Sequence, residues 1–472
     1  IFSGGDPLVW FGNAFQNDGS AFALGTTQAS ACGTGRISVL NSGGQFTGVP
    51  TCMQADARAI ASANSGATQS IDPNLKMPTV VRANLGFTTD LNFSSTGFFS
   101  GWNATLDYIY SEFRNPYTLV DLAQAPNPSA GLNGYAIDGR PIYASVDPLR
   151  PGCSARLSSV GAPPVYSGLS AACFTGSNRG ADLMLTNSKG YRSHVASFLL
   201  NKQFKGGIFT STGSTYLSFG YAYTNSHDRR NMYNSTAGSN YGQSAAFDRQ
   251  NPAAAPGFYQ SKHNFTFNTN FREEFFGEGL GTSLGITFVA RSGRPYSLTF
   301  SGNNTFNTTL GGLSTQDNAL AYIPTGANDP NLSPSSNTAA VNSLMNFVNG
   351  LDCANKYKGK SITRNTCTND WFFDVDLTIS QELPGPGRFF GKNDKIRVYG
   401  MVDNFLNLLN RNWNVQRRRN FFGVQDIATT SGVDAQGRYI ISGFTGNTFD
   451  ADNQINFSSS VWRLKVGVSY EF

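Results

Sequence analysis

The side chains able to perform acid–base or nucleophilic chemistry are sparse in this chain. It has three histidines, His194, His227 and His263, and it contains no GxSxG, HExxH or Walker motif. Histidine often acts as a general acid or base, but each of these also suits a polar strand end. The glycines of "GEGLG" at Gly277 suit a turn, and "DADN" at Asp450 lacks the later acidic ligand of a calcium loop. We therefore expect no enzymatic activity and no catalytic, cofactor or metal site.

Six cysteines form three pairs that are close in the sequence. None has the CxxC spacing of a zinc site, and an even number in polar, Gly-rich segments favours disulfides in an oxidising compartment. The predicted bridges join Cys32 to Cys52, Cys153 to Cys173, and Cys353 to Cys367.

The composition excludes some functions and leaves the fold open. Charged residues make up 14% of the 472 residues, and aromatic residues make up 13%. The net charge of +5 shows no concentrated basic stripe, so we expect no nucleic acid partner. No apolar run is long enough for a transmembrane helix. The mean hydropathy of −0.27 does not exclude membrane strands, because averaging hides an apolar set that alternates with a polar one.

Alternation with a period of two recurs along most of the chain and predicts β-strands with one apolar side. The nine alternating segments are 81–93, 102–111, 194–204, 217–224, 265–271, 284–291, 374–380, 396–403 and 461–472. A soluble β-sandwich also has one apolar face per sheet, so the connections between the segments are needed to choose a fold.

The connections alternate between short and long. Short ones lie near Ser94, Lys205, Glu273 and Pro384, whereas those after Arg114, Asp228, Ser301 and Asn412 span about 75, 30, 70 and 45 residues. Transmembrane barrels sort their loops in this way, with short periplasmic turns and long external loops. We therefore predict an all-β fold, namely a transmembrane antiparallel β-barrel in a bacterial outer membrane.

This fold assigns an environment to each side of the strands. The residues expected to face lipid include Leu217, Phe219, Tyr221, Leu284, Ile286, Phe288, Val466 and Val468. The charges expected to face the lumen are Arg82, Asp90, Asp107, Arg291, Asp374, Asp376, Arg397, Asp403, Arg463 and Lys465. These charges could meet water in an open pore or the surface of a plug, and the sequence leaves both open.

Three consecutive arginines, Arg417, Arg418 and Arg419, follow the external end of a predicted strand. Guanidinium groups pair well with phosphate, so this cluster is a candidate contact for lipopolysaccharide. A plain group of loop charges is the alternative explanation.

Two regions near the C-terminus resemble a known family. The segment "KIRVYGMVDNFLNLLNRNW" from Lys395 to Trp413, followed by a last strand ending in Tyr-Glu-Phe, resembles the end of TonB-dependent outer-membrane transporters. "GRPIY" at Gly139 and "RSGRPYS" at Arg291 are similar to the Oar-like branch. The last strand resembles the signal read by the barrel-assembly machinery, carried by Trp462, Leu464, Val466, Val468, Tyr470 and Phe472.

The resemblance spans roughly Pro78 to Phe472 and implies a barrel of 22 strands, closed by an N-terminal plug and energised by an inner-membrane complex. Neither a plug nor a TonB box is visible in the sequence. The chain begins without an initiator Met or an apolar leader, so we expect either a removed signal peptide or a part of a longer protein.

The sequence as a whole favours the C-terminal part of a TonB-dependent, Oar-like receptor that imports an unidentified ligand. We expect residues 1–78 to form an external loop region with one disulfide, and residues 79–472 to supply barrel strands and long external loops. Nine strands would leave two open edges in lipid, so missing N-terminal strands or a partner chain should cover them. A diffusion porin and a scaffolding barrel that binds another surface component remain the alternatives.

Overall fold

The computed structural model describes residues 42–45, 51–52 and 68–472, apart from 96, 175–180, 231, 235, 303–304, 307–317, 392 and 420–422. Most of the predicted loop region 1–78 lies outside these residues, as does the predicted Cys32–Cys52 bridge, which needs Cys32. Within the described residues, no helix is long and apolar enough to span a membrane.

Nine long antiparallel strands form one sheet in which each strand pairs with the next in the path. They coincide with the nine alternating segments of the sequence: β2 (Thr79–Leu91), β3 (Trp102–Arg114), β10 (Tyr191–Lys205), β11 (Ser214–Asp228), β13 (His263–Glu273), β14 (Thr282–Arg291), β19 (Phe372–Pro384), β20 (Lys395–Asp403) and β25 (Arg463–Glu471). A short strand, β12 (Ala255–Pro256), adds to β11. Within the described chain, β2 and β25 do not pair with each other, so the sheet is open and forms no closed barrel.

The pairing register gathers the apolar side chains on one side of this sheet, which we call the apolar face. Phe219 lies opposite Leu200 on β10 and opposite Phe267 on β13. Phe288 in turn lies opposite Phe267 and Val375. Because directly paired residues point to the same side, the apolar set continues from strand to strand. All eight side chains expected to face lipid lie on this face.

The ten predicted charges lie together on the opposite side, the polar face. That this face lines a lumen stays a prediction.

Charged residues on the apolar face are confined to the ends of strands. Glu112 and Arg114 form an ion pair of 2.9 Å at one end of β3. Near the other end of the sheet, the ammonium of Lys202 donates to the carbonyl oxygens of Gly97 and Phe98 at 2.6 and 3.0 Å. It also lies 4.2 Å from the ring centroid of Phe204, and only 7% of the residue is exposed. The middle of the apolar face is therefore free of charge.

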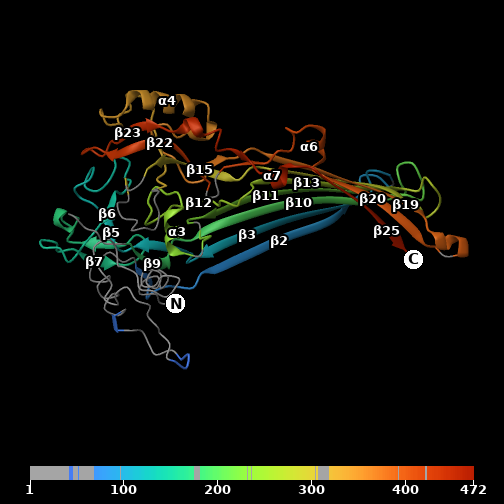
Figure 1. Cartoon of the computed structure of the whole chain (residues 1–472), viewed down its shortest axis with the longest axis horizontal. Coiled ribbons are helices and arrows are strands. Elements are labelled where there is room, and N and C mark those ends of the chain that lie inside the picture. Colours follow the sequence, from blue (N-terminus) through green and yellow to red (C-terminus); the bar gives the residue numbers. More distant parts are fainter. Residues whose placement is uncertain are drawn as a thin grey trace.

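Short and long connections lie at opposite ends of the strands (Figure 1). The four short turns are residues 92–101, 206–213, 274–281 and 385–394, and β25 also ends on their side. The four long connections are 115–190, 229–262, 292–371 and 404–462. Together they form a folded layer at the other end, which we call the cap.

The cap has its own small sheets and helices. Its strands are β4 (Tyr117–Asp121), β5 (Gln124–Pro126), β6 (Tyr143–Ser145), β7 (Arg156–Ser159), β8 (Val165–Ser167), β9 (Asp182–Asn187), β15 (Pro295–Ser301), β16 (Tyr322–Ile323), β17 (Lys360–Ser361), β18 (Cys367–Thr368), β21 (Arg417–Arg418), β22 (Val424–Val433), β23 (Tyr439–Phe444) and β24 (Gln454–Ile455). β1 (Thr68–Ile71) joins β9 in parallel. The helices are α3 (Ala237–Gly242), α4 (Thr338–Asn349), α5 (Asp352–Asn355), α6 (Phe405–Leu409) and α7 (Phe457–Ser460). The cap also holds two short 3-10 turns, η1 (Ala171–Cys173) and η3 (Gly446–Thr448), whereas η2 (Pro386–Phe390) lies in the short turn between β19 and β20.

A single large hydrophobic core draws side chains from all four long connections. Ile142, Ala245, Leu298 and Ile441 come from the first, second, third and fourth connection, and all are buried in it. The apolar face of α4 supplies Val341, Leu344 and Val348 to the same core. Burial of apolar surface is the main stabilising term in folding, so the long connections stabilise one another as a unit.

The long connection that was expected to begin after Ser301 begins earlier. β14 stops at Arg291, and residues 295–301 leave the main sheet to pair with β22 in the cap. Gly293 lies at the break, where a Cβ atom would come within 2.1 Å of the carbonyl oxygen of Asn369. Only glycine allows this close approach of two backbones, and Pro295 removes a strand donor immediately afterwards.

Two of the three predicted disulfides lie within the described residues, and both are present. Cys153 is bonded to Cys173 with a Cα–Cα distance of 4.8 Å, and Cys353 is bonded to Cys367 at 5.2 Å. Each bridge lies within one long connection, as expected. Cys173 and Cys367 are both fully buried in cap cores.

Removal of the Cys353–Cys367 bridge should loosen the cap and leave the main sheet intact. Paired serine substitutions should lower the stability of the cap by about 3 kcal/mol, because the unfolded connection then gains conformational freedom. Hydrogen exchange at β18 and α5 should speed up, whereas exchange in β3 and β10 should not change. Equal acceleration in both regions would contradict an independent contribution to the cap.

Candidate functional site

A pocket of about 300 Å³ lies where the cap meets the ends of β13, β14 and β19. Four arginines line it, Arg291, Arg294, Arg417 and Arg418, against one carboxylate, that of Asp370. We call it the arginine pocket. The remaining lining residues are Tyr259, Ser261, Ser292, Gly293, Asn369, Trp371, Phe372, Gln416, Asn456 and Ser459.

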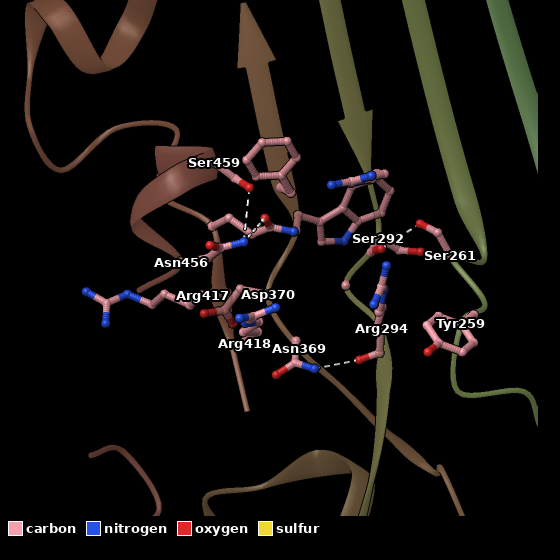
Figure 2. Close-up of a pocket in the computed structure, with 15 residues that line it drawn as sticks. Tyr259, Ser261, Ser292, Arg294, Asn369, Asp370, Arg417, Arg418, Asn456 and Ser459 are labelled. Atoms are coloured by element: carbon pink, nitrogen blue, oxygen red, sulfur yellow. Dashed lines mark hydrogen bonds between the residues drawn. The ribbon is translucent and has the colours of Figure 1, made fainter. Parts of the chain in front are cut away.

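Three connections that are distant in sequence build the pocket. Figure 2 shows Arg294 on one side and Arg417 with Arg418 and Asp370 on the other, with Asn369 between them in this view. Arg417 and Arg418 form β21, which pairs with β24 of the same connection. The arginines therefore meet only because the fourth long connection folds back over the start of β19.

The walls of the pocket are fixed by hydrogen bonds. The hydroxyl of Ser261 donates to the carbonyl oxygen of Ser292 at 2.7 Å, and the hydroxyl oxygen of Ser292 accepts from the amide of His263 at 3.0 Å. The backbone amide and the side-chain amide of Asn369 both donate to the carbonyl oxygen of Arg294, at 2.9 and 2.7 Å. These contacts hold the backbone of the arginines in place without using their guanidinium groups.

The guanidinium groups on one wall are positioned by aromatic rings. Arg291 lies 4.8 Å from the ring centroid of Phe372, and Arg294 lies 5.1 Å from that of Tyr259. A cation over a ring face keeps its charge and leaves N–H groups at its edge free to donate. Across the pocket, Arg417 makes one long contact of 3.4 Å with the carbonyl oxygen of Asn453.

None of the four pocket arginines forms an ion pair with a carboxylate of the described chain. Other cap arginines are engaged by carbonyl or carboxylate oxygens, including Arg140, Arg230, Arg249, Arg364, Arg419 and Arg438. Asp370 lines the pocket and Asp374 acts on Arg291 from nearby, so the four arginines leave an excess of positive charge there.

The three consecutive arginines, Arg417, Arg418 and Arg419, differ in their exposure to solvent. Arg417 and Arg418 are exposed, which leaves them available for an anionic partner. Arg419 is only 8% exposed, donates to the carbonyl oxygen of Phe449 and lies 3.4 Å from the centroid of its ring. Arg419 is therefore much less available for a lipopolysaccharide contact than its two neighbours, because its guanidinium is part of the cap core.

The predicted charges of the polar face are partly paired with their neighbours. Lys465 lies 3.4 Å from Asp403 on the adjacent strand. Arg397 donates to the hydroxyl of Ser380 at 3.3 Å, which is a weak contact between neighbouring strands. Of the ten predicted charges, only Arg291 lines the arginine pocket.

Sequence reasoning did not single out Arg294, Asn369 or Trp371 as site residues. Arg294 lies inside "RSGRPYS", which served only as a mark of resemblance. The sequence signal that could have identified Arg294 is its position three residues after Arg291, with Gly293 between them. The close backbone approach at Gly293 brings both arginines to the end of the same strand.

A second polar cluster holds the cap together around Arg140, which is 1% exposed. Its Nε donates to the hydroxyl of Tyr439 at 2.9 Å, and its Nη2 donates to Ser361 at 3.1 Å and to the carbonyl oxygen of Leu320. Asp138 completes the cluster by accepting from Tyr439 at 2.9 Å and from Ser361 at 2.7 Å. Burial raises the pKa of Tyr439 to about 12, so its hydroxyl stays protonated and can donate.

The segment that resembles the TonB-dependent family forms the end of β20 and helix α6. Asn404 adopts a left-handed conformation with φ of 54°, and its amide donates to the Asp376 carboxylate at 2.8 Å. Asn407 donates to the carbonyl oxygens of Arg411 and Trp413 at 3.1 and 3.0 Å. The two asparagines therefore turn the chain away from the sheet into the cap.

Acidic groups in the cap have structural partners. Burial raises the pKa of Asp426, whose carboxylate accepts from Thr299 at 2.6 Å. Burial likewise raises the pKa of Asp248, which accepts from the hydroxyl of Tyr143 at 2.8 Å. Across the described part of the chain, no three His, Cys, Asp or Glu side chains are grouped so that they could hold a metal ion.

Comparison of the chain with protein-family models, with curated proteins and with solved structures finds no match.

Proposed function

We propose that this chain supplies strands and external loops to a transmembrane β-barrel of the bacterial outer membrane, and that the barrel works as a TonB-dependent receptor. The observation that carries the proposal is the apolar face of the nine-stranded sheet, which extends across all nine strands and has no charge in its middle. Leu85 and Val466 on this face are 73% and 71% exposed. Contiguous apolar patches of this kind are rare on monomeric proteins in water, whereas lipid requires them.

Aromatic residues at both edges of the apolar face support a bilayer crossing. At the cap end, Trp371 stacks with His263, Phe265 and Phe373 at centroid distances of 6.1–6.3 Å. The hydroxyl of Tyr221 also contacts Nδ1 of His263 at 2.9 Å. Aromatic rings with a polar edge favour the boundary between lipid and water, and barrel proteins carry two such belts.

A second belt lies at the short-turn end. Phe98 contacts Trp102 and Phe204 with centroid distances of 5.4 and 5.7 Å, and the indole of Trp102 donates to the carbonyl oxygen of Phe98 at 2.7 Å. Each short turn also presents a pair of exposed large apolar residues: Phe98–Phe99, Ile208–Phe209, Phe275–Phe276 and Phe389–Phe390. A turn that contacts only water would not be expected to expose two large apolar side chains, because their exposure to water is unfavourable.

Carboxylates fix these turns, so the apolar pairs are presented by ordered backbone. Glu273 accepts from the amides of Ile208, Phe209 and Thr210. In the next turn, a hydrogen bond from Arg272 holds the pKa of Glu274 at about 2. These turns would then lie at the periplasmic surface and the cap would lie outside the cell, in agreement with short periplasmic and long external connections.

The proposed receptor role is supported by the resemblance of residues 395–413 to TonB-dependent transporters and by the arginine pocket at the cap. A receptor of this class captures its ligand on external loops and imports it with energy from the inner membrane. The open edges of β2 and β25 need further strands in lipid, because unpaired backbone groups there cost several kcal/mol each. Those strands would come from another part of the protein or from a partner chain.

Bilayer conductance and cell fractionation would test this function together. The full-length protein should fractionate with the outer membrane. Reconstituted in planar bilayers, it should conduct little steady current, because a receptor barrel is plugged. A large constant conductance would instead favour a diffusion porin, and recovery in the soluble fraction would contradict the membrane assignment altogether.

A further inference from the structure

We infer that the arginine pocket is a binding site for a small anion with at least two negative charges, carried by phosphate or carboxylate groups. The inference deepens the proposed receptor function, on which it rests for its biological meaning. Its chemical basis is independent, because it follows from the charge and the geometry of the pocket.

The pocket holds more positive charge than the nearby carboxylates can balance: Asp370 lines it, and Asp374 acts on Arg291 without forming an ion pair. Four guanidinium groups face one carboxylate, and none of the four is in an ion pair. Like charges repel one another, and Arg294 acts in this way on Arg291, so this arrangement costs stability unless an anion or solvent compensates it. An anion with two or more charges fits the excess of arginine over aspartate.

The geometry of the pocket matches the way arginine binds oxyanions. The guanidinium groups of Arg291 and Arg294 lie over the rings of Phe372 and Tyr259, a contact that does not use their N–H donors. A planar donor edge binds carboxylate or phosphate through two parallel hydrogen bonds. Amide and hydroxyl groups of Asn369, Ser459 and Asn456 line the same space and can contact the neutral part of a ligand.

The size of the pocket limits the ligand to a small molecule or a single headgroup. A volume of about 300 Å³ lies at the lower end of the range for small-molecule sites. A free phosphorylated or polycarboxylated molecule and the phosphate of a lipid headgroup share the required chemistry. Arg417 and Arg418 are exposed at the rim, so an anion can approach from either source.

Binding of inorganic pyrophosphate to the full-length protein in detergent would test the site by calorimetry. We expect saturable binding that weakens as salt concentration rises, because the contacts are ionic. Arg291→Gln with Arg294→Gln should weaken binding at least about tenfold, since hydrogen bonds to charged groups contribute strongly. Arg417→Gln with Arg418→Gln changes only exposed residues and should weaken binding without affecting folding.

Arg411→Gln is the matched control, because Arg411 is exposed on the same connection and lies outside the pocket. Absence of binding by the unsubstituted protein, or equal loss in Arg411→Gln and in the pocket variants, would overturn the inference.

Vesicles containing lipid A, compared with phosphatidylcholine vesicles, distinguish the two sources of the anion. Competition between lipid A and pyrophosphate that requires the pocket arginines would assign a headgroup, whereas binding of pyrophosphate alone would assign a soluble ligand. Lack of pocket-dependent binding in both arms would overturn the site. If the unsubstituted protein binds pyrophosphate but supports no energised uptake, the receptor function is overturned and the binding site stands.

Discussion

Replacement of Ile286 by arginine is expected to destabilise the membrane-inserted protein by about 2–4 kcal/mol. Ile286 lies in the middle of β14 on the apolar face, where it is paired with Thr269 and Leu377. A guanidinium there would lie in hydrocarbon without a partner, because the middle of this face holds no acidic residue. Urea unfolding in lipid vesicles would measure the loss.

The next residue provides the control. Thr287 lies on the polar face directly opposite Asp376, so Thr287→Arg should change stability by less than about 1 kcal/mol. An equal loss in both variants would mean that the two faces do not differ in environment. A soluble sheet would show that result if both faces were in water.

Replacement of Arg140 by alanine should destabilise the cap by about 3–5 kcal/mol, because it leaves buried oxygen atoms without donors. Arg140 contacts all four long connections. It belongs to the first, stacks 4.9 Å from the ring centroid of Phe247 in the second, and donates to Leu320 and Ser361 in the third. Its bond to Tyr439 reaches the fourth.

Hydrogen exchange would localise this effect. Protection should fall in β15, β22 and β23 together, since one residue connects these segments, while the main sheet keeps its protection. Arg438→Ala is the matched control. Arg438 pairs with Asp434 at 2.8 Å on a partly exposed surface, and such pairs contribute about 1 kcal/mol or less. If Arg140→Ala lowered protection only in the first connection, Arg140 would not join the four connections as proposed.

The nine strands and the faces of their side chains were predictable because the determining pattern is local. Alternation between residues such as Leu464, Lys465 and Val466 needs no knowledge of the rest of the chain. A strand with one apolar side can bury or expose that side only as a whole. The two observed disulfides were predictable for a similar reason, since each bridge closes a short segment within one connection.

The long connections were predicted only as loops, and the structure gives them a folded cap. Its strands are short, and the parallel pair of β15 with β22 joins segments more than a hundred residues apart. Such pairings leave little periodicity in the sequence. The same tertiary contacts explain why the third long connection was expected to begin only after Ser301, although Pro295–Ser301 already belongs to the cap.

The sequence by itself determined where the chain forms long strands, which side of each strand is apolar, and where the local disulfides lie, because neighbouring residues settle these properties. Only the tertiary structure decided the fate of individual arginines. Arg140 is joined to Tyr439 across 299 positions, Arg419 is buried beside Phe449, and Arg418 lies in an open pocket with Arg294. Consecutive arginines look alike in a sequence, and their roles differ because burial and charge compensation depend on distant segments that folding brings together.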